Sequence, residues 1–107
     1  MTTEAPLACS LGATDYTNRL AWIAALNTAS LRSYRRVGGR LTLVYAADAV
    51  VPVRELVRRE QECCAFLRFT VATSEEAVTL DVRVPDTALD AAGDLLAPFL
   101  AGSSPQQ

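Results

Sequence analysis

The chain has 107 residues and a net charge of −2, and half of its residues are apolar. These values are typical of one soluble globular domain with a single core, so we expect residues 1–107 to form one domain. All ten basic residues are arginine, and the absence of histidine excludes imidazole as a base, an acid or a metal ligand. Because the sequence shows no strongly basic face, we predict no direct contact with nucleic acid.

The first ten residues, MTTEAPLACS, contain neither a basic start nor a long apolar run. No segment reaches the roughly 18 apolar residues that a membrane-spanning helix needs. We therefore expect no membrane contact and a cytoplasmic location, where thiols stay reduced. The three cysteines are an odd number, which argues against a disulfide framework.

The first predicted element is a long helix. Residues 1–13 form an extended lead-in, Thr14 fits an N-cap, and the apolar spacing predicts a helix over 15–36. The apolar residues of this segment fall on two faces, and Trp22 lies on the second of them. A helix of this kind is covered on both faces, on one by the sheet and on the other by a second helix or a second subunit, and we expect a homodimer. The alternative is that the N-terminal arm packs over Trp22.

The glycines at 38 and 39 are predicted to end this helix. The elements that follow are a strand over 40–46, a helix from Asp48 to about 64, a strand over 67–73, a hairpin turn over 73–77, a strand over 78–84, a helix over 87–100 and a flexible tail over 103–107. The order α-β-α-β-β-α predicts an α+β fold, with helices packed on an antiparallel sheet of three or four strands. Residues 5–11 are the candidate for a fourth strand.

Glu60 is the most informative residue of the second predicted helix. At about 100° per residue, Glu60 and Cys64 fall in the middle of the apolar stripe of that helix, and Cys63 falls at its edge. A charged carboxylate that faces a core is costly unless it is paired or bound to a metal. Its spacing from the two cysteines brings helical side chains into contact, which predicts a thiol site. The alternative is that Glu60 reaches the rim of the core and pairs with an arginine.

Three thiolates without histidine suit soft ions, namely Hg(II), As(III) and Cu(I), and less specifically Zn(II). Cys9 lies in the lead-in and would join Cys63 and Cys64 if the lead-in crosses the end of the second helix. Glu60 would then be a fourth ligand or a proton acceptor, and no organic cofactor is implied. A thiolate at this place needs a positive partner, for which Arg68, a backbone N–H or the bound cation is available.

The motifs C-x-L at 9–11, R-L at 19–20 and E-x-x-C-C-x-F-x-x-F at 60–69 resemble a family of small bacterial proteins. Members of this family are fused to, or neighbours of, regulators of the mercury-resistance type. The resemblance covers residues 7–100 and implies a heavy-metal or thiol-stress context, with a metal-responsive regulator as a partner. The positions that it carries over as site or site-lining residues are Cys9, Glu60, Cys63, Cys64, Phe66 and Phe69. Ala65 stands where members often have proline, which weakens the expectation of a sharp break after the cysteines.

Three functions fit these residues. The first, which we favour, is a domain that binds a soft metal or metalloid ion through its thiolates. The second is a thiol redox or transfer enzyme, with Cys63 as nucleophile, Cys64 or Cys9 as resolving thiol and Glu60 as general base. The third is a non-catalytic accessory domain in which the cysteines only fill space in the core.

Overall fold

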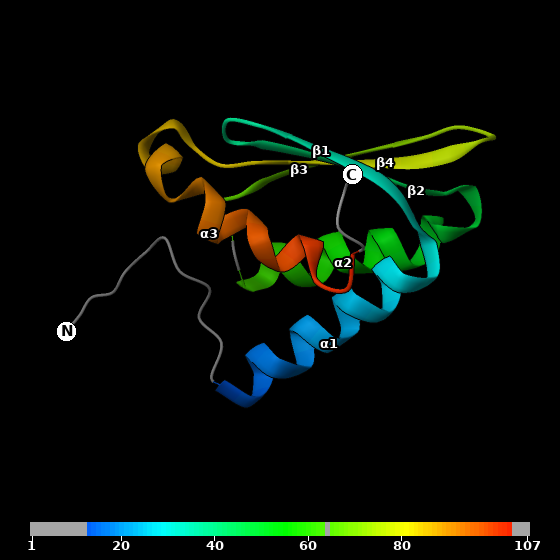
Figure 1. The fold of residues 1–107 in the computed structure, drawn as a ribbon, viewed down its shortest axis with the longest axis horizontal. Coiled ribbons are helices and arrows are strands. Elements are labelled where there is room, and N and C mark those ends of the chain that lie inside the picture. The colour runs from blue at the N-terminus through cyan, green and yellow to red at the C-terminus, as the bar shows by residue number, and fades with distance from the viewer. Residues whose placement is uncertain (1–12, 64, 104–107) are drawn as a thin grey trace.

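A four-stranded antiparallel sheet with helices on one side forms the architecture of the protein (Figure 1). The computed structural model describes residues 13–63 and 65–103. Its helices and strands are α1 (Ala13–Ser30), β1 (Leu31–Val37), β2 (Arg40–Ala46), α2 (Val50–Cys63), β3 (Arg68–Thr73), β4 (Ala77–Arg83) and α3 (Ala92–Leu96). Short 3-10 turns precede α2 at Ala47–Ala49 and flank α3 at Asp86–Ala91 and Ala97–Leu100. The predicted α+β class, with helices packed on an antiparallel sheet, is confirmed.

The fourth strand is β1, which the sequence predicted as the end of the first helix. The helix ends at Ser30, and the chain turns back as a hairpin in which Val37 is paired with Arg40. Gly38 sits in this two-residue turn with φ of 58°, a conformation that glycine adopts without steric cost. The prediction of a helix over 15–36 was therefore wrong at its C-terminal end. The glycine pair closes a hairpin and does not cap a helix.

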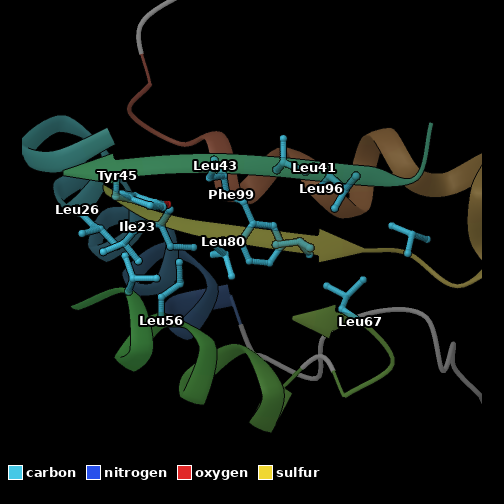
Figure 2. Packing of buried hydrophobic residues seen from close by; sticks show 14 of the residues in the cluster. Ile23, Leu26, Leu41, Leu43, Tyr45, Leu56, Leu67, Leu80, Leu96 and Phe99 are labelled. Carbon is cyan, nitrogen blue, oxygen red and sulfur yellow. The ribbon is translucent and has the colours of Figure 1, made fainter. Parts of the chain in front are cut away.

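The core lies between the sheet and the helices, and the central strands β2 and β4 contribute most of its sheet residues (Figure 2). Alternate residues of these two strands are completely buried, as the alternating patterns RLTLVYA and VTLDVRV predict. The buried strand residues are Leu41, Leu43, Tyr45, Val78, Leu80 and Val82. Ile23 and Leu26 from α1 and Leu56 from α2 pack against these strand residues. The strand order β1-β2-β4-β3 thus places the two most apolar strands at the centre of the sheet.

The C-terminal segment closes the core, although it is not the single helix predicted over 87–100. It is broken into three short helical pieces, and Pro98 lies in the first turn of the last one. Phe99 is fully buried beneath the sheet, and its ring lies 5.9 Å from the ring of Phe69 in an edge-to-face arrangement. Proline lacks a backbone N–H and clashes with the preceding turn of an α-helix, which explains why the helix does not continue through this point.

A buried polar clasp holds this segment in place. The side-chain amide of Asn27, which is 3% exposed, donates to the carbonyl oxygens of Phe99 at 2.9 Å and Ala101 at 2.7 Å. Its oxygen accepts a hydrogen bond from the hydroxyl of Tyr45 at 3.0 Å. Because every donor of this amide is satisfied, its burial is tolerated, and it joins α1, β2 and the C-terminal segment.

Several predictions from the sequence fall outside the residues that the structure describes. These are residues 1–12 of the extended lead-in, the candidate strand over 5–11, the residues Cys9 and Cys64, and all but the first residue of the predicted tail. Ala13, predicted to lie in the lead-in, already belongs to α1. Within residues 13–63 and 65–103, no helix combines the length and the apolar character that crossing a membrane requires.

Candidate functional site

The C-terminal half of α2 carries the residues that the sequence marked as a site. Val53 and Leu56 of this helix are buried against the core, and Glu60 continues their stripe one turn later. Glu60 is only 1% exposed, so the prediction that this carboxylate faces inward is confirmed. A buried carboxylate needs a partner, and the structure shows which residue provides it.

Arg19 of α1 is that partner. Its Nη2 donates to Oε1 of Glu60 at 2.6 Å, and its Nε donates to Oε2 at 2.8 Å. The side chains are 9% and 2% exposed, so this is a buried, two-pronged ion pair. The guanidinium carbon also lies 5.7 Å from the centre of the Phe99 ring, a favourable position for a cation over an aromatic face. We call Arg19 and Glu60 the buried pair.

The buried pair combines the two interpretations that the sequence left open. Glu60 points into the molecule, as the site hypothesis required, and it pairs with an arginine, as the alternative required. Sequence reasoning did not identify Arg19 as the partner. The signal was present, because Arg19 precedes Ile23 and Leu26 by four and seven residues, the spacing of one helix face. An arginine in line with two core residues has the same unusual placement as a glutamate in line with two others.

The cysteines are only partly placed. Cys63 is the last residue of α2, whereas Cys9 and Cys64 lie outside the described residues. Within the described ranges 13–63 and 65–103, no group of three or more Cys, Asp, Glu or His residues is arranged to hold a metal ion. The described part of the site is therefore the end of α2 and the buried pair beside it.

The three residues predicted to line the thiol site lie in different parts of the structure. Phe66 and Phe69 are half-buried and pack against the core, Phe69 directly against the ring of Phe99. Arg68 begins β3 opposite Arg83, whereas Phe69 is opposite the buried Val82. Because side chains alternate between the faces of a strand, Arg68 lies on the sheet face that is remote from the helices. Arg19, and not Arg68, is thus the arginine next to Glu60.

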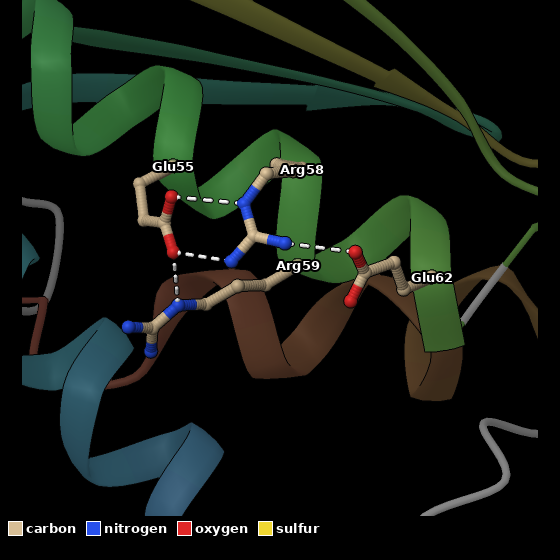
Figure 3. A network of polar contacts seen from close by, with 4 residues as sticks. All are labelled: Glu55, Arg58, Arg59 and Glu62. Carbon is tan, nitrogen blue, oxygen red and sulfur yellow. Dashed lines mark hydrogen bonds and ion pairs between the residues drawn. The ribbon is translucent and has the colours of Figure 1, made fainter.

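The exposed side of α2 holds a second group of charges, which Figure 3 shows from close by. The two oxygens of Glu55 accept hydrogen bonds from Arg58 at 3.0 and 2.7 Å, and one of them accepts a further bond from Arg59 at 2.8 Å. Arg58 also reaches Glu62 at 2.8 Å. These hydrogen bonds, first from Arg58 and then from Arg59, lower the pKa of Glu55 to about 2. We call these four residues the surface network.

Arg59 also packs over Trp22, which lies on the second apolar face of α1. Its guanidinium carbon lies 4.4 Å from the centre of the Trp22 ring, which is half-buried. A cation above an aromatic face is stabilised by the ring quadrupole, so Trp22 has a partner within its own chain. Part of the face that suggested a homodimer is therefore covered by α2 of the same chain.

No protein-family model matches the chain, and no curated protein or solved structure matches it either.

Proposed function

We propose that this protein binds a soft metal or metalloid ion, Hg(II) or As(III) before Cu(I) and Zn(II), through Cys63, Cys64 and Cys9. The observation that carries the proposal is the position of Cys63 at the C-terminal end of α2, one turn after the buried pair. A helix C-terminus carries partial negative charge, which favours a cation and disfavours a free thiolate. This position therefore favours a metal-bound sulfur over a free nucleophilic thiolate.

The same argument weighs against the thiol enzyme. Reactive cysteines have lowered pKa values and are typical of helix N-termini or of sites beside cations. Both oxygens of Glu60 accept hydrogen bonds from Arg19, so this carboxylate has its charge compensated and is a poor general base. The geometry supports Glu60 and Arg19 as positioning residues that fix the end of α2 against α1, with the thiols as the metal ligands.

The family resemblance adds the metal context to this proposal. A metal-responsive regulator as partner, and a homodimer, stay predictions that rest on the sequence. In this proposal the ion is the cargo of the domain, because the fold has a hydrophobic core of its own.

Native mass spectrometry of the reduced protein, with and without one equivalent of Hg(II), As(III), Cu(I) or Zn(II), tests the proposal. We expect one bound ion per chain and a thiolate-to-metal ultraviolet band, both reduced in Cys63→Ser and in Cys64→Ser. Because ligation releases thiol protons, affinity should rise with pH up to about 8.5, the usual pKa of a thiol. The same spectra report the number of subunits.

Ala65→Ser is a matched control, because it places a hydroxyl next to the cysteines without removing sulfur, and residue 65 is exposed. It should bind the ion as the natural sequence does. If the Cys63→Ser/Cys64→Ser variant binds as tightly as the natural sequence, the proposal is wrong. A thiol that is alkylated with a pKa well below about 8 would instead support the enzyme.

A further inference from the structure

The second face of the sheet is open. All three helices lie on one side of the sheet in Figure 1, and the strand residues that alternate with the core residues point to the other side. By the strand register, this open face carries Ser33, Arg35 and Val37 from β1, Arg40, Thr42 and Val44 from β2, Ala77, Thr79, Asp81 and Arg83 from β4, and Arg68, Thr70 and Ala72 from β3. The arginines among them are exposed to solvent.

Three of these arginines form a row across the sheet. Arg40 is directly opposite Arg83, and Arg83 is directly opposite Arg68, on three adjacent strands. Like charges in direct cross-strand positions destabilise a sheet, and natural sheets usually place opposite charges there. The row covers about 10 Å, since neighbouring strands are about 4.8 Å apart. We call Arg40, Arg83 and Arg68 the arginine row.

Only part of this charge is balanced on the face itself. Arg40 forms a two-pronged pair with Asp81, at 3.0 and 3.1 Å, and the hydroxyl of Thr42 donates to the same carboxylate at 2.6 Å. The hydrogen bond from Arg40, followed by that from Thr42, holds the pKa of Asp81 below its usual range against the opposing effect of burial, and the charges of Arg40 and Arg83 add to this effect. In the described part of the chain, no ion pair is formed by Arg83, Arg68 or Arg35. A chain with a net charge of −2 thus presents one clearly positive face.

A groove extends this face along β1 and β2. It has a volume of about 570 Å³ and is lined by Arg35, Arg40, Ser33 and Thr42 together with Tyr34, Val37 and Val44. This size is within the range of small-molecule sites, and charged, hydroxyl and apolar groups all line it. The groove and the arginine row share Arg40, so together they form one continuous surface.

The chemistry of this surface favours a ligand with several phosphates in series. Guanidinium groups bind phosphate with two parallel hydrogen bonds, and serine and threonine hydroxyls are common phosphate contacts. Protein interfaces are anchored by large aromatic and apolar side chains, whereas the strand register places no aromatic residue on the open face, where Val37 and Val44 are the largest apolar groups. Because the surface is long and open, a polymer makes more contacts with it than a small anion does.

We propose that the open face of the sheet binds single-stranded nucleic acid through its phosphates. Arg68 and Arg83, on adjacent strands, contact one part of the phosphate backbone, Arg35 contacts it further along on β1, and a sugar and base occupy the groove beside Arg35. Tyr34 is opposite the buried Leu43 and therefore lies on the core face of β1, so the open face offers no aromatic platform for stacking, and binding has little sequence preference. The sequence predicted no such contact, because its arginines are scattered over residues 35–83 and only the strand register brings them together.

Fluorescence anisotropy with labelled oligothymidylate of about 12 nucleotides and the reduced, metal-free protein tests this proposal. We expect a Kd in the range of about 10⁻⁶–10⁻⁴ M that weakens from about 50 to about 200 mM salt. Three phosphate contacts on a single strand predict a slope of log K against log salt of about −2. Arg68→Gln/Arg83→Gln should weaken binding about tenfold and make this slope shallower by about 1.4, which a purely structural role would not do.

Arg54→Gln is the matched control. Arg54 is exposed on α2, on the helix side of the molecule, and its replacement changes the net charge as each of the other substitutions does. It should leave the affinity within about twofold. Thermal unfolding completes the control, because removal of like charges from the row should leave the melting temperature unchanged or raise it.

Four results would overturn the proposal. The first is no binding at about 50 mM salt, and the second is equal weakening by Arg54→Gln and by Arg68→Gln/Arg83→Gln. The third is displacement of the oligonucleotide by an equal concentration of inorganic triphosphate, which would make the face a site for free phosphates. The fourth is equally tight binding of polyglutamate, which would make it a site for acidic protein segments.

Discussion

Two groups of ion pairs on α2 use the same chemistry in opposite environments. The buried pair has N···O distances of 2.6 and 2.8 Å, and the surface network has distances between 2.7 and 3.0 Å. In the buried pair the side chains are 9% and 2% exposed, whereas those of the surface network are between 33% and 68% exposed. Distance therefore does not distinguish the two groups, and solvent access does.

Solvent access decides what each group does for the protein. Water solvates every member of the surface network when its partner is removed, so such pairs contribute little to stability. Each member of the buried pair is almost fully removed from solvent, so removal of one partner leaves a charge in the core without its two-pronged counter-ion. The buried pair adds less to stability than its geometry suggests, but it fixes how α1 and the C-terminal half of α2 meet.

The largest expected effect is that of breaking the buried pair. Glu60→Ala should lower the free energy of unfolding by about 3–5 kcal/mol, because Arg19 keeps its charge without its buried partner. Urea denaturation followed by circular dichroism measures this change. A loss below about 1 kcal/mol would show that the pair behaves like a surface pair.

Replacing both members should recover most of that loss. Arg19→Met/Glu60→Leu removes the two charges together and fills the same space, and such exchanges are often neutral or stabilising. We expect the double variant to be more stable than Glu60→Ala by at least about 2 kcal/mol in the same denaturation experiment. If the double variant is as unstable as Glu60→Ala, the buried charge of Arg19 is not the cause of the lost stability.

An intermediate effect is expected where the buried group is polar but uncharged. Tyr45→Phe removes the hydrogen bond to Asn27 and should cost about 1–2 kcal/mol. Burial also raises the pKa of the Tyr45 phenol, so the folded state retains a proton that the unfolded state loses. Stability is therefore complete below pH 10, the ordinary pKa of tyrosine, and should fall above it by about 1.4 kcal/mol per pH unit.

Denaturation at pH 9 and at pH 11 measures the alkaline effect of Tyr45. Tyr45→Phe should abolish this effect, while Tyr34→Phe, a change at the partly buried edge of the core, should retain it. An unchanged alkaline slope in Tyr45→Phe would contradict the assignment.

The smallest effect is expected in the surface network. Hydrogen bonds from Arg58 and then Arg59 lower the pKa of Glu55 from 4.5 to about 2, so its contribution is present above pH 4.5 and is lost as pH falls towards 2. Because solvent and salt screen this network, Glu55→Gln should change the melting temperature at neutral pH only slightly, and not at all in high salt. A drop as large as that of Glu60→Ala would erase the distinction between the two groups.

The local patterns of the sequence were sufficient for much of the fold. The strict alternation in 40–46 and 78–84 predicted β2 and β4, because one face of each strand is buried. A shift of the pairing by one residue would turn every apolar side chain of such a strand to the solvent. The apolar stripe of α2 likewise predicted that Glu60 faces inward, since a helix turns by a fixed angle per residue. In the candidate site, the sequence thus identified the acid but not its partner.

The remainder was decided by contacts between distant segments. The stretch 31–37 fits a helix by its own spacing, and only pairing with β2 makes it a strand. Arg19 meets Glu60 across 41 positions of the chain, and the arginine row exists only because β2, β4 and β3 are aligned in one register. Periodicity determines which way a side chain points from its own element. Which side chain it then faces depends on how the elements pack, and that information is distributed over the whole chain.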